Sequence, residues 1–113
     1  MTIKAWQRKV DVWITEFGVR YFDVKTNALL LSEEVGEFSR LIARGYGEQS
    51  FKKEISNEEV KIRIAEEMAD IIFVTTCLAN QLDIDLTHEL EKNIEKKTNR
   101  DKVRHINNPK LKF

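Results

Sequence analysis

Residues 30–42, LLSEEVGEFSRLI, decide how the rest of the chain is interpreted. Read as a helix, the stretch places two leucines and two glutamates on one face, namely Leu30, Glu34, Glu37 and Leu41. The leucines at its ends predict that this face is buried. A buried, unpaired carboxylate costs several kcal/mol or becomes neutral, so something must compensate Glu34 and Glu37. A divalent cation that prefers oxygen ligands is the expected partner.

A second stretch, residues 60–74 with the sequence VKIRIAEEMADIIFV, repeats the pattern. Glu67 falls within an apolar stripe at helical spacing, and Asp70 lies one turn further on the same side. Two such helices packed antiparallel would bring four carboxylates together. The predicted metal ligands are therefore Glu34, Glu37, Glu67 and Asp70. Neither stretch contains His or Cys, so Mg²⁺ is expected, with Mn²⁺ as a substitute, rather than zinc.

The alternative interpretation of these acids is a solvated charged face held by ion pairs along each helix. Against it, Glu33 and Glu37 are like charges four residues apart, which repel. No Lys or Arg stands four residues after Glu34, Glu37 or Glu67. Glu33 and Glu37 are the candidate catalytic residues, since either could take a proton from water. For Glu33, an outer position around the metal or plain exposure to solvent stays open.

Composition excludes several classes of protein. The chain has 113 residues, enough for one domain, with 42% hydrophobic and 34% charged residues. A formal net charge of zero argues against a general polyanion binder, so no nucleic-acid partner is expected. The single Cys77 lies in an apolar run and is expected to be a buried thiol in a reducing compartment. With no signal peptide and no apolar span, we expect a cytoplasmic protein without a membrane partner.

The fold expected is all-α, an antiparallel bundle of about four main helices that forms an oligomer. One proline and four glycines favour long helices. The expected helices cover residues 3–17, a segment from Asp23 or Thr26 to Arg44, a segment from the N-cap Ser56 to Gln81, and residues 86–100 after the cap Asp85. Glu59 is expected to complete a capping box with Ser56. Residues 1–105 would form the domain and residues 106–113 a C-terminal tail.

Aromatic residues follow one face of the first predicted helix. Trp6, Trp13 and Phe17 share an apolar stripe there, and core packing is the favoured role for them. The alternative is that Trp6 or Trp13 stacks on a flat ligand, which makes both candidate base-binding residues. Asn27 is a weaker candidate for a polar contact. His88 and His105 are expected at the surface.

A basic row follows one face of the fourth predicted helix. Asn93, Lys96 and Arg100 repeat at helical spacing and are the candidate phosphate-binding residues. The alternative is a solvated basic face that balances the acids elsewhere. Mg²⁺ held by few carboxylates usually also binds phosphate, so a predicted metal site in so short a chain favours the phosphate interpretation.

These motifs together resemble the all-α nucleoside triphosphate pyrophosphohydrolases of the MazG-like superfamily. The order is Glu-Glu-x-x-Glu, then Glu-x-x-Asp, then Asn-x-x-Lys, and the resemblance extends over residues 6–100. It implies the four metal ligands given above, the leading glutamate Glu33, and phosphate contacts from Asn93, Lys96 and Arg100. It also implies a homodimer or homotetramer with the site near a subunit interface. One departure is the long segment between the acidic motifs, whose extra length lies within residues 45–56.

The resemblance implies Mg²⁺-dependent hydrolysis of a nucleoside triphosphate to the monophosphate and pyrophosphate, in which aberrant nucleotides could be cleared. One alternative is a non-catalytic helical interaction module with an acidic groove and a basic arm, which predicts binding without metal. Another is a related phosphohydrolase that acts on a different phosphorylated metabolite, such as phosphoribosyl-ATP. A substrate panel discriminates among the three.

Overall fold

The computed structural model describes residues 1–112, and all regular secondary structure in that range is helical, without strands. Its main elements are α1 (Ile3–Trp13), α2 (Val24–Tyr46), α3 (Asn57–Gln81) and α4 (Leu86–Asp101), with a π-helical turn η1 (Ile14–Gly18) and a 3₁₀ turn η2 (Pro109–Leu111). The predicted all-α fold with four main helices is confirmed.

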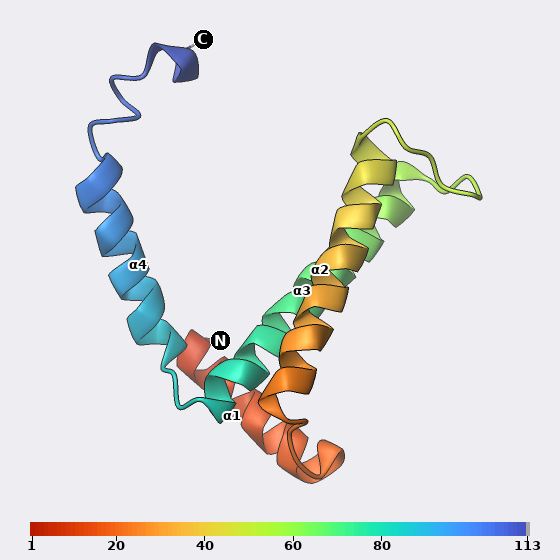
Figure 1. The fold of residues 1–113 in the computed structure, drawn as a ribbon, viewed down its shortest axis with the longest axis vertical. Coiled ribbons are helices and arrows are strands. Elements are labelled where there is room, and N and C mark those ends of the chain that lie inside the picture. The colour runs from red at the N-terminus through yellow and green to blue at the C-terminus, as the bar shows by residue number, and fades with distance from the viewer. Residues whose placement is uncertain (113) are drawn as a thin grey trace.

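The long helices α2 and α3 form an antiparallel pair, and α1 crosses the end of that pair near the C-terminus of α3 (Figure 1). The two helices lie close together at Gly45. A Cβ atom added there would lie 2.6 Å from Cγ1 of Val60, whose side chain is buried. Only glycine allows the two helices this separation without displacing Val60.

Side-chain caps begin the helices where the sequence predicts them. The Asp23 carboxylate accepts from the Thr26 N–H at 2.7 Å, and the Asp85 carboxylate accepts from the Thr87 N–H at 3.0 Å. Ser56 accepts from the Glu59 N–H at 3.1 Å. The predicted capping box is wrong in its second half, because the Glu59 carboxylate pairs with Arg63 at 3.1 Å instead of reaching back.

The first helix also differs from its prediction at its C-terminal end. After Trp13 the helix widens into the π-helical turn, and Phe17 is 70% exposed rather than part of the core. Val19 then takes a φ of 70° and a ψ of −53°, while the Arg20 N–H donates to the Gly18 carbonyl at 2.8 Å. This geometry is a γ-turn of the rare, strained form, and it reverses the chain toward α2.

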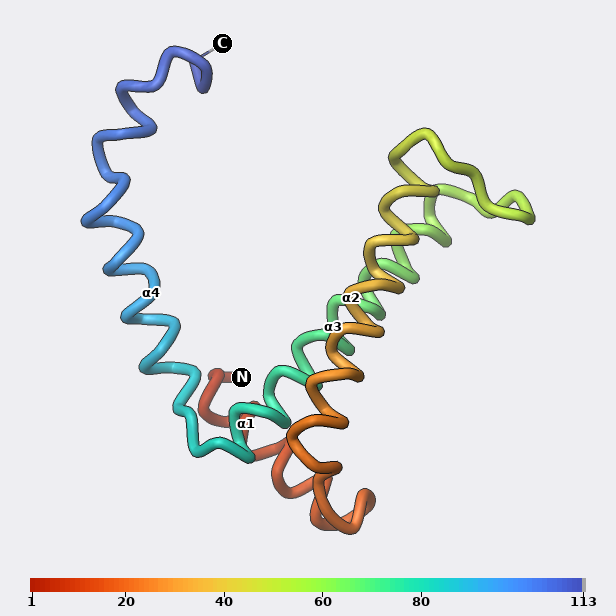
Figure 2. Tube along the Cα trace, viewed as in Figure 1, coloured from red at the N-terminus to blue at the C-terminus, as the bar shows by residue number. Residues whose placement is uncertain are grey.

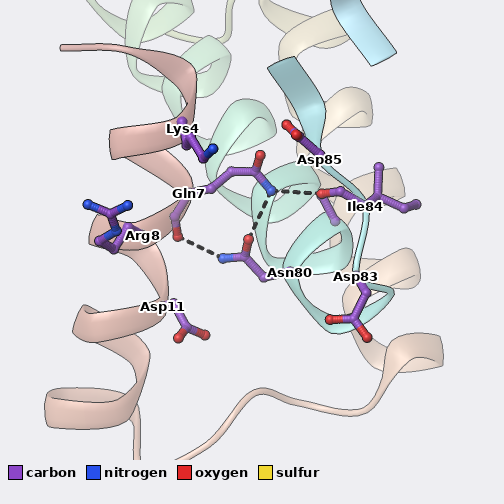
Figure 3. Close-up of a pocket in the computed structure, with 9 residues that line it drawn as sticks. Lys4, Gln7, Arg8, Asp11, Asn80, Asp83, Ile84 and Asp85 are labelled. Atoms are coloured by element: carbon purple, nitrogen blue, oxygen red, sulfur yellow. Dashed lines mark hydrogen bonds between the residues drawn. The ribbon is translucent and has the colours of Figure 1, made fainter. Parts of the chain in front are cut away.

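A hydrogen-bond network joins α1 to the turn between α3 and α4 (Figure 3). The Gln7 side chain donates to Asn80 Oδ1 at 3.0 Å and to the Ile84 carbonyl at 2.9 Å. Its Oε1 accepts from the Leu86 N–H at 2.9 Å, which is one of the free donors at the start of α4. Asn80 returns a bond of 2.9 Å to the Gln7 carbonyl. The network therefore sets the direction in which α4 leaves.

That direction carries α4 away from the α2–α3 pair, and the chain has the shape of a V with α1 at its base (Figures 1 and 2). The main packing partner of α4 is α1. The radius of gyration is 18.0 Å, whereas about 13 Å is expected for a compact domain of this length. Leu90 and Ile94 on α4 are 49% and 64% exposed. Buried side chains are few: most lie where α1 meets the α2–α3 pair, whereas Leu41 and Val60 lie between α2 and α3 at the other end of the pair.

Candidate metal and nucleotide site

Three carboxylates from two helices meet in the middle of the α2–α3 pair. One oxygen each from Glu34, Glu67 and Asp70 lies within 4.8 Å of the other two. Glu34 and Glu67 are half-buried, and Asp70 is exposed. The antiparallel register places Glu34 opposite both residues of the second motif. We refer to these three residues as the acid cluster.

Within the acid cluster, Glu67 has a buried carboxylate oxygen, Oε2, that lacks a hydrogen-bond partner in residues 1–112. The pKa of Glu67 is raised from 4.5 to about 7. The largest cause is the carboxyl group of Glu34, which can share a hydrogen bond with Glu67 only when one of the two holds a proton; burial and the negative charges of Glu34, Asp70 and Glu37 add to it.

Either a proton or a cation can relieve this arrangement. A buried, unpartnered carboxylate oxygen among like charges favours a positive ion. The atoms available as metal ligands are all carboxylate oxygens, which suit a hard divalent cation. The residues present therefore fit a metal site.

Glu37 lies beside the acid cluster but outside its group of three oxygens. Its carboxylate pairs with Arg40 at 3.0 Å, and both side chains are about half exposed. Arg40 stands three residues after Glu37. The sequence argument against ion pairs considered only the fourth residue after each glutamate, so it missed this pair. Its charge still reaches Glu67, whose pKa it helps to raise. Glu33 is exposed on the same helix.

An apolar cavity of about 310 Å³ opens one helical turn from the acid cluster. Leu30 lines it one turn before Glu34, and Phe73 lines it one turn after Asp70. Trp13 and the buried Asn27 also face this cavity. The sequence therefore indicates two of its lining residues, Trp13 and Asn27. The remaining lining residues are apolar or come from the turn after η1, without a signal in the sequence that marks them.

Trp6 has a different place from Trp13. Its indole N–H donates to Thr76 Oγ1 at 2.8 Å, and its ring meets the edge of Phe73 with centroids 6.4 Å apart. Trp13 packs edge-on against the same Phe73 at 5.7 Å. Trp6 thus packs against Phe73, and it is absent from the cavity lining.

The predicted phosphate-binding residues lie on α4, apart from the acid cluster. Asn93, Lys96 and Arg100 are all exposed along that helix, and the helix packs mainly on α1. The Arg100 guanidinium binds its neighbour Asp101 at 2.7 Å. Within one chain, the structure does not bring this row to the three carboxylates.

The profile of the MazG nucleotide pyrophosphohydrolase domain matches residues 22–105 of the chain, which contain the acid cluster and α4. The chain belongs to the MazG nucleotide pyrophosphohydrolase family. Enzymes of this family generally depend on a metal, which agrees with the three clustered carboxylates. Membership supports nucleotide pyrophosphohydrolase activity.

Among relatives of this MazG chain is the uncharacterized protein YpjD of Bacillus subtilis strain 168. The two are 36% identical over 103 residues, which cover 91% of this chain and 89% of YpjD. The crystal structure of YpjD from Bacillus subtilis, described as a candidate pyrophosphatase, superposes with a TM-score of 0.72 at 34% identity. That superposition covers 85% of this chain and 94% of the other. In residues 1–112, no helix is long and apolar enough to cross a membrane.

Proposed function

We propose that this MazG-family protein hydrolyses a nucleoside triphosphate to the monophosphate and pyrophosphate with the help of Mg²⁺, for which Mn²⁺ can substitute. Two observations on one residue carry the proposal: a Glu67 carboxylate oxygen lies within 4.8 Å of oxygens from Glu34 and Asp70, and Oε2 of Glu67 is buried without a partner in residues 1–112. Glu34, Glu67 and Asp70 would hold the cation. Glu37, one turn along α2, is the fourth candidate ligand once it leaves Arg40.

A bound divalent cation would neutralise phosphate charge and make water a better nucleophile. The water oxygen bonds to the α-phosphorus while the bond from that phosphorus to the bridging oxygen of the β-phosphate breaks. Pyrophosphate departs with the electron pair. Glu37 or Glu33 accepts the proton that the water loses. The exposed pair between Glu37 and Arg40 is weak enough to exchange, because such pairs contribute at most about 1 kcal/mol.

The apolar cavity beside the acid cluster is the proposed site for the nucleobase. Its volume of about 310 Å³ suits a single planar ring system, and it lies one turn from the proposed metal ligands. Phe73 and Trp13 offer apolar ring surface, and Asn27 offers the polar contact. Trp6 acts by holding Phe73 in place rather than by touching the base.

The row on α4 would complete the site from a second copy of the chain. Asn93, Lys96 and Arg100 can approach the acid cluster only when α4 packs on another α2–α3 pair, because their own helix diverges from it. The exposed Leu90 and Ile94 supply an apolar face for such packing. We therefore propose a homodimer or homotetramer with the site at a subunit interface.

The test is pyrophosphate release from a panel of standard and modified nucleoside triphosphates, together with phosphoribosyl-ATP, in the presence of Mg²⁺. Glu67→Gln and Asp70→Asn should each lower kcat by more than about a hundredfold, because even residues that only support a metal ligand contribute 10- to 100-fold. Glu58→Gln makes the same chemical change at an exposed position in the first turn of α3 and should leave kcat unchanged.

Folding of the variants is checked by circular dichroism, since both substitutions keep side-chain size. Undiminished turnover in Glu67→Gln and Asp70→Asn would remove the metal assignment. Turnover of none of the triphosphates would reject the proposed reaction. Turnover of phosphoribosyl-ATP alone would redirect the proposal to that substrate.

A further inference from the structure

A second cleft, lined by cations, lies where α2 ends and α3 begins. Its volume is about 350 Å³. Five positive side chains line it, namely Arg40, Arg44, Lys52, Lys53 and Arg63. No negative side chain lines this cleft, although the chain as a whole has no net charge. We refer to it as the basic cleft.

The basic cleft gathers like charges that the protein only partly compensates. Arg40 and Arg63 each pair with a carboxylate, at 3.0 and 3.1 Å, but all four side chains in these pairs are about half exposed. In residues 1–112, Arg44, Lys52 and Lys53 have no carboxylate within ion-pair distance. Cations around one cleft repel one another unless an anion joins them, and their combined field attracts one.

Two apolar side chains also line the basic cleft. Phe51 and Ile55, both half-buried, line it among the cations. Apolar walls strengthen the field of the charges around them, because water screens them less. The volume is that of a small-molecule site rather than of an extended surface for a macromolecule. A compact, multiply charged anion is the ligand that such a cleft suits.

The basic cleft lies about one to two helical turns from the acid cluster along the α2–α3 pair. On α3, Arg63 precedes Glu67 by one turn, and on α2, Arg40 follows Glu37 by one turn. Arg40 follows Glu34 by six positions, roughly 9 Å along the helix. Apolar cavity, acid cluster and basic cleft therefore follow one another along the pair. This order matches the order of base, reacting phosphate and distal phosphates in a nucleotide.

We propose that the basic cleft binds a diphosphate group and, resting on the proposed function, that this group is the distal end of the triphosphate, which leaves as pyrophosphate. Lys52 and Lys53 come from the connection between α2 and α3. Arg40 links the two sites: it releases Glu37 when it turns to the phosphate.

The binding test uses inorganic pyrophosphate and isothermal titration calorimetry, with full-length protein in buffer freed of divalent cations by a chelating resin. Wild type should bind pyrophosphate, and Lys52→Ala/Lys53→Ala should bind it about tenfold more weakly or worse. The matched control Lys25→Ala/Lys61→Ala removes the same charge from exposed sites outside the cleft and should bind as wild type does. Equal binding by Lys52→Ala/Lys53→Ala and wild type would overturn the proposal, as would sulfate binding as tightly as pyrophosphate at the same ionic strength.

The link to the reaction is tested by kinetics. Lys52→Ala/Lys53→Ala should raise KM for the triphosphate by about the same factor as the pyrophosphate Kd, with a smaller change in kcat. An unchanged KM would overturn the assignment of the cleft to the substrate. Glu67→Gln should lose turnover yet bind pyrophosphate at least as tightly as wild type without metal. If the wild type hydrolyses no triphosphate, the proposed function fails, while the calorimetry still decides whether the cleft binds diphosphate.

Discussion

At the residue scale, Glu67 links the sequence pattern to the proposed chemistry. The pattern placed this glutamate in an apolar stripe, and the structure leaves one of its oxygens buried without a partner. The neighbouring carboxyl group of Glu34 makes its ionisation harder still. Such a residue weakens the folded protein unless a ligand is bound, which is common at functional sites.

Without metal, stability should fall as the pH rises from about 4.5 to about 7, because the folded protein holds the Glu67 proton more tightly than the unfolded chain does. The stabilisation that comes from the Glu67 proton is fully present below pH 4.5, the pKa of Glu67 in the unfolded chain, and is lost once the pH passes about 7. Thermal unfolding from pH 4.5 to 8 in metal-free buffer measures it.

The Glu67→Gln variant is the reference for that titration, because glutamine does not ionise. The difference in Tm between wild type and Glu67→Gln should shrink toward low pH. Saturating Mg²⁺ should stabilise the wild type most above pH 7, where the carboxylate is free of its proton. A difference that is independent of pH would show that Glu67 does not titrate in this range.

The strained γ-turn at Val19 gives a second prediction at this scale. The Val19 side chain is 86% exposed, so its packing contributes little free energy to offset the strain of a φ of 70°. Val19→Gly should stabilise the protein by about 1 kcal/mol, since strain of about 1–3 kcal/mol is relieved against the entropy of a more flexible unfolded chain. Chemical denaturation measures it, with Val12→Gly in α1 as a control that should destabilise.

At the element scale, helix boundaries could be predicted because each start has a side chain that supplies its own cap. Asp23, Ser56 and Asp85 all cap the helices they were expected to begin. The γ-turn could not be predicted, since a valine with positive φ leaves no mark in a sequence. The basic cleft was missed because the segment between α2 and α3 has no helical periodicity.

The course of α4 was also beyond prediction. Its apolar residues Leu86, Leu90 and Ile94 repeat as they would in any bundle, and the pattern does not say which chain they pack against. Among the candidate site residues, Glu34, Glu67 and Asp70 could be brought together by reasoning from spacing alone, whereas Glu37 pairs with Arg40 beside them. Those on α4 could not, because the period of one helix does not say how that helix lies relative to the others.

Gly45 gives a prediction about the packing of α2 on α3. Gly45→Ala should destabilise the protein by about 1–3 kcal/mol, because the new methyl group would meet Val60 at 2.6 Å. Gly36→Ala is the matched control in the same helix: nothing lies within 4 Å of the added Cβ, so it should stabilise by about 0.5–1 kcal/mol. Urea unfolding compares the two, and equal effects of both substitutions would contradict the close approach.

At the scale of the whole molecule, the V shape leaves apolar faces of two arms open. Besides Leu90 and Ile94, the outer face of α3 exposes Ile62 and Ile72, at 53% and 56%. A monomer with so much exposed apolar surface and so few buried residues is poorly stabilised. Association of several chains through α4 would cover these faces.

The double substitution Leu90→Lys/Ile94→Lys should therefore reduce the proposed assembly to monomers, because it would bury charges in the interface. Light scattering after size exclusion at micromolar concentration measures the mass. His88→Lys/Asn99→Lys adds the same charges on the opposite side of α4 and should leave the mass unchanged. A wild-type monomer under these conditions would contradict the proposed assembly.

The placement of all three clustered carboxylates on one helical hairpin has a consequence for synthesis. Residues 24–81 leave the ribosome before α4 does, and contacts between neighbouring helices form sooner than those between distant segments. A nascent chain would thus possess its cation-binding half at a time when α4 has yet to emerge. Under the proposed assembly, a single chain could bind the ion, whereas turnover would begin only after that chain meets a second copy. Ion binding and the onset of turnover would then be separate events.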